Sequence, residues 1–150
     1  MNISVELIPR TSFGTNLRSK FRVGDWDTLR RYCYREANYC CQLCGGVGPN
    51  HPVEAHELWE YNDGIQKIVD LLALCPTCHI AHHPGFARTQ GRCAEARAQL
   101  MKVNQWSAED AQDHIDKAFL VWEDRSQIEW KLDLTLAQQM LDHLNDSITH

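Results

Sequence analysis

Two Cys-x-x-Cys pairs constrain this 150-residue chain more than any other feature of its sequence. The first pair is Cys41-Gln-Leu-Cys44 and the second is Cys75-Pro-Thr-Cys78. A two-residue spacer lets both thiolates of a pair face one point, and Zn²⁺ takes four such ligands in a tetrahedron. The chain begins without a secretory signal pattern, so a cytoplasmic location is expected, where paired cysteines more often bind metal than form disulfides. The sequence therefore predicts one structural zinc site.

The 30 residues between the two pairs (45–74) are more than a plain zinc ribbon needs, which is about 15–20. Asn62-Asp63-Gly64 is a strong turn signal between two apolar runs. Residues 53–61 are expected to form a strand, and residues 65–74 either the return strand of a hairpin or a short helix leading into one. Pro76 suits the first turn of a helix over 76–83. A hairpin followed by a helix indicates an α+β fold.

The rest of the chain is expected to be mostly helical. A short strand is expected at the N-terminus, and Asp25 and Ser107 are good caps for two of the helices. No apolar run approaches the ~20 residues of a membrane span, so no membrane partner is expected. The expected elements are a strand over 3–8 and helices over about 26–38, 90–103, 108–126 and 134–146.

Three histidines accompany the cysteine pairs. His79 directly follows the second pair, and His83 lies four residues further on, so that both share one face of a helix and can bind one ion. His56 lies in the first strand of the expected hairpin. A single histidine is more often a surface or core residue, but here several histidines lie close in the sequence to two Cys-x-x-Cys pairs. They are therefore candidates for a second metal site.

The run from Cys41 to His83 resembles the HNH (ββα-metal, or His-Me finger) endonuclease family of the zinc-knuckle type. The resemblance implies a zinc-stapled ββα-metal hairpin–helix core with flanking N- and C-terminal helices. It implies three parts: a basic strand, loop and helix over 1–40, the HNH-like core over 41–88, and an acidic helical part over 89–150 that packs on the core.

The same resemblance implies an active site. His56 would be the general base, and His79 and His83 would hold a catalytic Mg²⁺ or Mn²⁺, alternatively Zn²⁺ or Ni²⁺. Asp70 stands where many members have Asn, and would orient His56 or join the metal site. The sequence departs from the family at Ala55, where Asp or His is a common further metal ligand, and neither Glu54 nor Glu57 is a simple substitute.

Charge is distributed unevenly along the chain, whose net charge is −5. Residues 1–40 hold seven Lys or Arg against four Asp or Glu, whereas residues 105–150 hold three against ten. The basic part is expected to bind nucleic acid, DNA in the first place, through its phosphates. The acidic helices offer a surface for a homodimer or a protein partner, or are simply solvated. The residues expected to contact the phosphate backbone of the nucleic acid are Arg18, Lys20, Arg22, Arg30, Arg31 and Arg35.

Three functions are compatible with these residues. The first is a metal-dependent endonuclease or nickase. The second, favoured by Ala55 and by the net acidity, is a non-catalytic zinc-stapled module that binds nucleic acid or protein. The third is a thiol-redox protein acting through Cys75-Pro-Thr-Cys78, which requires a depressed pKa at Cys75 or Cys78.

Overall fold

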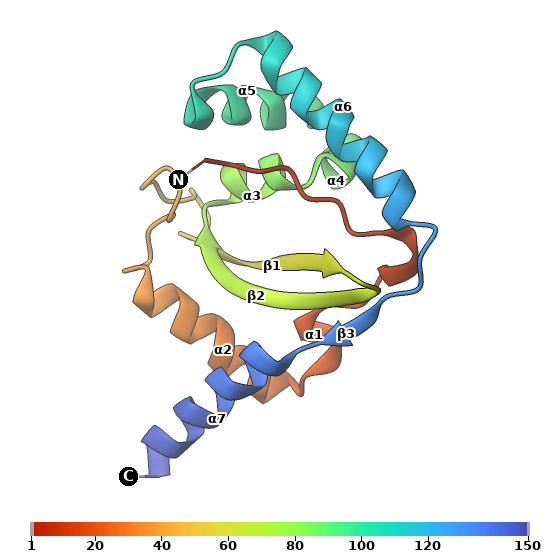
Figure 1. Cartoon of the computed structure of the whole chain (residues 1–150). Coiled ribbons are helices and arrows are strands. Elements are labelled where there is room, and N and C mark those ends of the chain that lie inside the picture. The colour runs from red at the N-terminus through yellow and green to blue at the C-terminus, as the bar shows by residue number, and fades with distance from the viewer. Residues whose placement is uncertain (1, 150) are drawn as a thin grey trace.

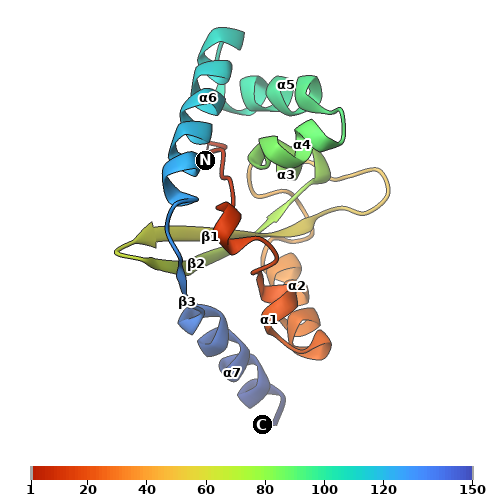
Figure 2. The same cartoon turned by 90° about the vertical axis from the view of Figure 1, so that its right-hand side faces the viewer.

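A long β-hairpin forms the centre of the protein, with helices on both sides (Figure 1). The structure is a computed structural model that describes residues 2–149, and side chains for residues 2–147. One group of helices, α3 to α6, lies on one side of the hairpin, and α1, α2 and α7 lie on the other (Figures 1 and 2). The α+β fold expected from the sequence is confirmed. No helix within the described residues is both long and apolar enough to cross a membrane.

The hairpin consists of β1 (Glu54–Asn62) and β2 (Ile65–Leu74), which pair antiparallel. Asp63 and Gly64 form the turn with φ of 51° and 75°, the left-handed values that an Asp-Gly turn accommodates. Both apolar runs are therefore strands, and the second is not a helix. The register shifts by one residue between Leu58 and Trp59, which marks a bulge.

A third strand, β3 (Lys131–Asp133), pairs parallel with the start of β2. The sequence did not indicate it, because three half-exposed residues carry no alternating pattern. Its pairing brings the chain back across the hairpin between α6 and α7 (Figure 1).

The helices on the first side follow from local signals. Cys75 caps α3 (Pro76–His82) by accepting a hydrogen bond from the Cys78 N–H, and Pro76 fills the first turn. The chain bends at His83, and Pro84 begins α4 (Pro84–Thr89), so that it starts a new helix as well as ending the previous one. The remaining helices of this side are α5 (Cys93–Asn104) and α6 (Ala108–Arg125), the latter capped by Ser107 as expected.

The helices on the second side cover the other face of the hairpin. They are α1 (Leu17–Lys20), α2 (Val23–Glu36) and α7 (Thr135–Thr149). α2 begins at Val23, so that Asp25 lies in its first turn rather than at its cap. The buried residues Leu29, Trp59, Ile68 and Leu141 belong to the core on this side. The C-terminal part therefore packs on both sides of the hairpin, α5 and α6 on one and α7 on the other.

Residues 3–8 form an extended segment, here called the N-terminal strap, that runs past α3 towards the end of α6 (Figure 1). The expected strand over these residues was wrong, because the strap joins no sheet of the described chain. Its backbone is satisfied by other partners: Ile3 exchanges two hydrogen bonds with the Asn104 side chain, and the Val5 N–H donates to His114 Nε2. The strap is thereby fastened to α5 and α6.

Candidate metal centres and cleft

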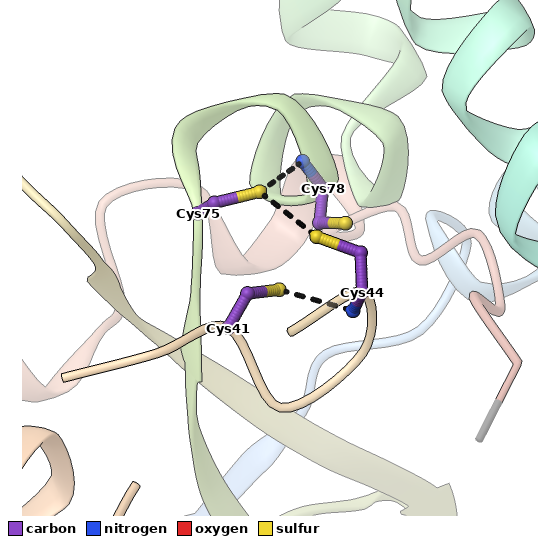
Figure 3. A group of neighbouring side chains, drawn as sticks. All are labelled: Cys41, Cys44, Cys75 and Cys78. Carbon is purple, nitrogen blue, oxygen red and sulfur yellow. Dashed lines mark hydrogen bonds between the residues drawn. The ribbon is translucent and has the colours of Figure 1, made fainter. Parts of the chain in front are cut away.

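The four cysteine thiols meet at one point, as the sequence predicted (Figure 3). Cys41 and Cys44 lie on the loop before the hairpin, Cys75 follows β2, and Cys78 lies in the first turn of α3. All four Sγ atoms are within 4.8 Å of one another, and those of Cys44 and Cys75 are 3.6 Å apart. A tetrahedron with Zn–S bonds of about 2.3 Å needs S···S distances of about 3.8 Å. The group therefore suits a structural zinc ion.

Backbone N–H groups surround these sulfur atoms. The N–H groups of Cys44, Gly46 and Cys78 donate to Cys41, Cys44 and Cys75 Sγ, respectively, at 3.4–3.5 Å. Such donors stabilise thiolates, the form that binds metal. At Cys41, burial raises the pKa, but backbone N–H donors outweigh it and hold the pKa at about 7.

The thiol-redox hypothesis loses support at the second pair. Burial raises the pKa of both Cys75 and Cys78, whereas an exchange-active thiol needs a lowered one. The cysteine cluster instead joins three segments of the fold around one point, which is the arrangement of a structural metal site.

A glutamine that the sequence analysis missed contacts the cysteine cluster. The side-chain N–H of Gln99, on α5, donates to Cys78 Sγ at 3.1 Å. A partner in this position orients a metal ligand and offsets its negative charge. Nothing in the sequence distinguishes Gln99 from other polar residues of α5. Gln99 and Cys78 are 21 residues apart, and no local sequence pattern indicates that they are in contact.

Replacing Gln99 with alanine should weaken zinc binding about 10- to 100-fold, the usual cost of losing such a partner, without unfolding the protein. Competition with a chromogenic chelator measures the affinity, and circular dichroism checks the fold. Lys102→Ala, an exposed change on the same helix, is the matched control. Equal zinc affinity in the two variants would show that the Gln99 contact has no energetic role.

A second cluster consists of His56 on β1, His79 on α3 and His83 at the junction of α3 and α4. One ring nitrogen from each lies within 4.8 Å of the others. His83 Nε2 is 3.2 Å from His56 Nδ1, close to the roughly 3.3 Å between two nitrogens bound tetrahedrally to one zinc-sized ion. The expected pair of ligands is thus accompanied by a third nitrogen, which His56 itself supplies.

Two members of the histidine cluster, His56 and His83, are held in their neutral form. Burial, together with the neighbouring imidazoles, lowers the pKa of His56 well below its usual value and that of His83 to about 3. His82 stacks on the His56 ring at a centroid distance of 4.4 Å. Neutral imidazole carries the free electron pair that a metal ligand or a general base needs.

Glu6, on the strap, faces the opposite edge of the His56 ring. Its Oε2 lies 3.7 Å from His56 Nε2, which is beyond hydrogen-bond distance, and neither atom has a hydrogen-bond partner among the described residues. The other oxygen, Oε1, accepts from the Trp59 N–H at 3.2 Å, and the Glu6 N–H donates to the His82 carbonyl. Burial raises the pKa of Glu6 to about 7. The sequence analysis missed Glu6. Its only distinguishing feature in the sequence is that it is an acidic residue within an apolar segment.

The structure does not bring Asp70 into the histidine cluster. Its side chain is exposed, and its carboxylate accepts a hydrogen bond from the Leu71 N–H at 2.8 Å. Glu54 comes closer than expected, with Oε1 3.5 Å from His79 Nδ1. Glu57 instead holds the start of α1 by accepting from the Leu17 N–H. The carboxylates around the cluster are therefore Glu6 and Glu54, rather than Asp70.

The histidine cluster opens onto a cleft of about 1110 Å³. The strap, β1, α1, α2, α4 and α6 all contribute to its walls. Two of the six basic residues expected to contact nucleic acid, Arg18 and Arg30, line the cleft, together with Arg88, which was not expected. The four others do not line it: Lys20, Arg22, Arg31 and Arg35.

Comparisons of this chain with models of known protein families, with curated proteins and with solved structures gave no match.

Proposed function

We propose that this chain is a metal-dependent endonuclease or nickase of the HNH type, which hydrolyses phosphodiester bonds of nucleic acid, with DNA the expected substrate. The observation that carries the proposal is the histidine cluster on a hairpin–helix unit next to a four-cysteine site, at the wall of a cleft that also contains arginines. A phosphodiester needs a positive centre at the phosphate and a base for the attacking water. This group of residues offers both.

In this proposal His79 and His83 hold a divalent ion, and His56 acts as the general base. A bound ion supplies charge neutralisation at the phosphate and at the leaving oxygen. The two imidazole ligands suit Zn²⁺ or Ni²⁺ better than Mg²⁺, which prefers oxygen ligands. The four-cysteine site holds the structural Zn²⁺ that fixes α3 to the hairpin.

The geometry around His56 suits the role of base. With its proton on Nε2, directed at Glu6, the ring keeps a free electron pair on Nδ1 beside His83 Nε2. From there Nδ1 takes the proton of a water molecule that attacks phosphorus, and the leaving oxygen departs on the opposite side. Arg18 and Arg88, both exposed at the cleft, hold the flanking phosphates.

Nicking of supercoiled plasmid tests the proposal. The zinc-loaded protein should be inactive in EDTA and should convert the plasmid to nicked circles when Mn²⁺, Ni²⁺ or excess Zn²⁺ is supplied. An absence of cleavage with every ion tried, on plasmid and on single-stranded DNA, would contradict it.

A non-catalytic binding module is the second candidate, and a specific observation favours it. The His56 side chain is 1% exposed, and its Nδ1 lies beside the His83 nitrogen, so all three imidazoles can bind one ion. His56 would then have no free electron pair for a proton. This candidate expects tight binding of a second ion, together with nucleic-acid binding that leaves the phosphodiester intact.

Replacing Glu6 with glutamine should lower kcat about 10- to 100-fold with little change in KM or zinc content. The amide keeps the shape of the side chain but removes the carboxylate that faces His56 Nε2 at 3.7 Å and that we expect to orient the ring. Single-turnover cleavage measures kcat. Glu57→Gln changes another partly buried carboxylate of the cleft wall, which accepts from the Leu17 N–H instead, and serves as the matched control. If both variants lose the same activity, Glu6 has no particular role at His56.

A further inference from the structure

Three aromatic side chains line the cleft while remaining largely exposed. They are Phe13, Tyr39 and Phe86, which are 66%, 50% and 57% exposed. Exposed apolar groups gathered in one hollow are uncommon on a protein surface unless they bind something. They do not serve the chemistry proposed for the histidine cluster, which needs only polar groups. We therefore expect the rings to contact a part of the ligand other than the phosphate at the histidine cluster.

The backbone at Tyr39 holds an uncommon conformation. Asn38 and Tyr39 have φ of 53° and 58°, consecutive left-handed residues at the end of α2. Asparagine tolerates this region, but a bulky aromatic residue does so rarely, and such conformations cluster at functional sites. The Tyr39 N–H donates to the Tyr34 carbonyl, which fixes the turn. Both tyrosines line the cleft.

The aromatic side chains line the same cleft as the histidine cluster. Tyr39 follows α2, whereas Phe86 lies on α4, three residues after His83, and these two helices lie on opposite sides of the hairpin (Figures 1 and 2). Cations accompany the rings on both sides. Arg18 lies on α1, on the same side of the hairpin as α2, and the guanidinium of Arg88, on α4, lies 4.5 Å above the Phe119 ring.

We infer that the cleft binds an unpaired stretch of DNA or RNA, whose bases stack on Tyr39 and Phe86 on either side of the phosphate held at the histidine cluster. This inference rests on the proposed function and names its substrate class. A groove that combines arginines with accessible rings binds single strands, because every unpaired base offers a face for stacking. In a duplex those faces are already covered by neighbouring bases. A cleft of about 1110 Å³ has room for a few nucleotides.

Fluorescence anisotropy of labelled oligonucleotides tests the inference without requiring cleavage. The full-length, zinc-loaded protein is titrated in EDTA-free buffer containing Ca²⁺ against a 12-nucleotide oligo-dT, an oligo-U and a 12-base-pair duplex. Both single strands should bind at least 10-fold more tightly than the duplex. A preference for one of them identifies DNA or RNA as the source of the unpaired strand. An abasic strand of the same length, which keeps the phosphates, should bind much more weakly than oligo-dT.

Variants at the rings provide the second measurement. Tyr39→Ala and Phe86→Ala should each weaken single-strand binding about 5- to 150-fold, the range expected for the loss of one stacked base. Phe86→Trp should bind single strands as tightly as the wild type or more tightly, because the larger ring stacks better. Leu120→Ala, which removes an equally exposed apolar side chain outside the cleft, is the control and should bind as the wild type does.

The outcomes separate this inference from the proposed function. Ring-dependent single-strand binding without cleavage under any metal ion would support the inference and contradict the endonuclease. Metal-dependent cleavage of duplex plasmid, with no preference for single strands and no effect of Tyr39→Ala or Phe86→Ala, would overturn the inference and leave the endonuclease in place. Equal binding of abasic and normal strands would also overturn it, because the phosphates alone would then account for the affinity.

Discussion

Replacing Cys78 with serine should prevent zinc binding at the cysteine cluster and abolish the cooperative unfolding transition of the protein. Cys78 is fully buried between α3 and α5, and its thiolate completes the cysteine cluster. Structural zinc contributes roughly 10–16 kcal/mol of binding free energy in zinc-finger peptides, and that binding energy is folding energy. This contribution is as large as the whole stability of most domains, about 5–15 kcal/mol, so its loss is expected to unfold the protein.

Thermal melts followed by circular dichroism, combined with zinc analysis, check this expectation. Cys44→Ser should behave in the same way, since it removes another member of the cluster. Cys93→Ser is the matched control, because Cys93 is exposed and lies outside the cluster, and it should melt as the wild type does. An unchanged cooperative melt of the wild type in excess chelator would contradict a structural role for the metal.

Replacing His56 with alanine should reduce kcat for cleavage by about 10²- to 10⁴-fold, the usual contribution of a general base. Zinc at the four-cysteine site should remain, because His56 belongs to the other cluster. Single-turnover nicking measures the rate, and His143→Ala, an exposed histidine on α7, is the control.

Because His56 is almost completely buried, its removal also leaves a cavity. Added imidazole is of the right size to occupy this space and should restore part of the activity. Rescue distinguishes a lost base from a damaged fold, which imidazole does not repair. Full activity in the alanine variant, without imidazole, would show that another group takes the proton.

Local spacing explains what the sequence predicted well. Two-residue spacers place Cys41 with Cys44 and Cys75 with Cys78, and the Asp63-Gly64 turn folds the intervening chain so that the pairs meet. The helix that starts at Pro76 then carries His79, and His83 directly follows its last residue, so that both reach His56. All of these relations depend on short spacings between residues, which can be read directly from a sequence.

Long-range contacts explain what the sequence did not predict. Glu6 approaches His56 from a segment 50 residues away, and Gln99 reaches Cys78 from another helix. Neither contact has a periodic signature. Asp70 was favoured by its position in the family pattern, but its carboxylate binds the adjacent Leu71 N–H instead. The strap resembled a strand because its apolar residues alternate, yet side chains of α5 and α6 satisfy its backbone.

The basic residues illustrate the same limit. The sequence predicted six contacts within the first 40 residues, but Arg31 and Arg35, on α2, do not line the cleft, and neither do Lys20 and Arg22. Arg18 and Arg30 line it, and Arg88 joins them from α4, far along the chain. Charge counts along a sequence indicate an excess of basic residues, whereas the fold decides which of them face a common surface.

We expect cleavage to require a second metal ion, bound at the histidine cluster. Elemental analysis and plasmid nicking of the His79→Ala/His83→Ala double variant, beside the wild type, test it most directly. The variant should keep one zinc per chain, fail to bind the second ion that the wild type takes up, and leave the plasmid intact. A variant that binds the same amount of metal and nicks at the wild-type rate would contradict it.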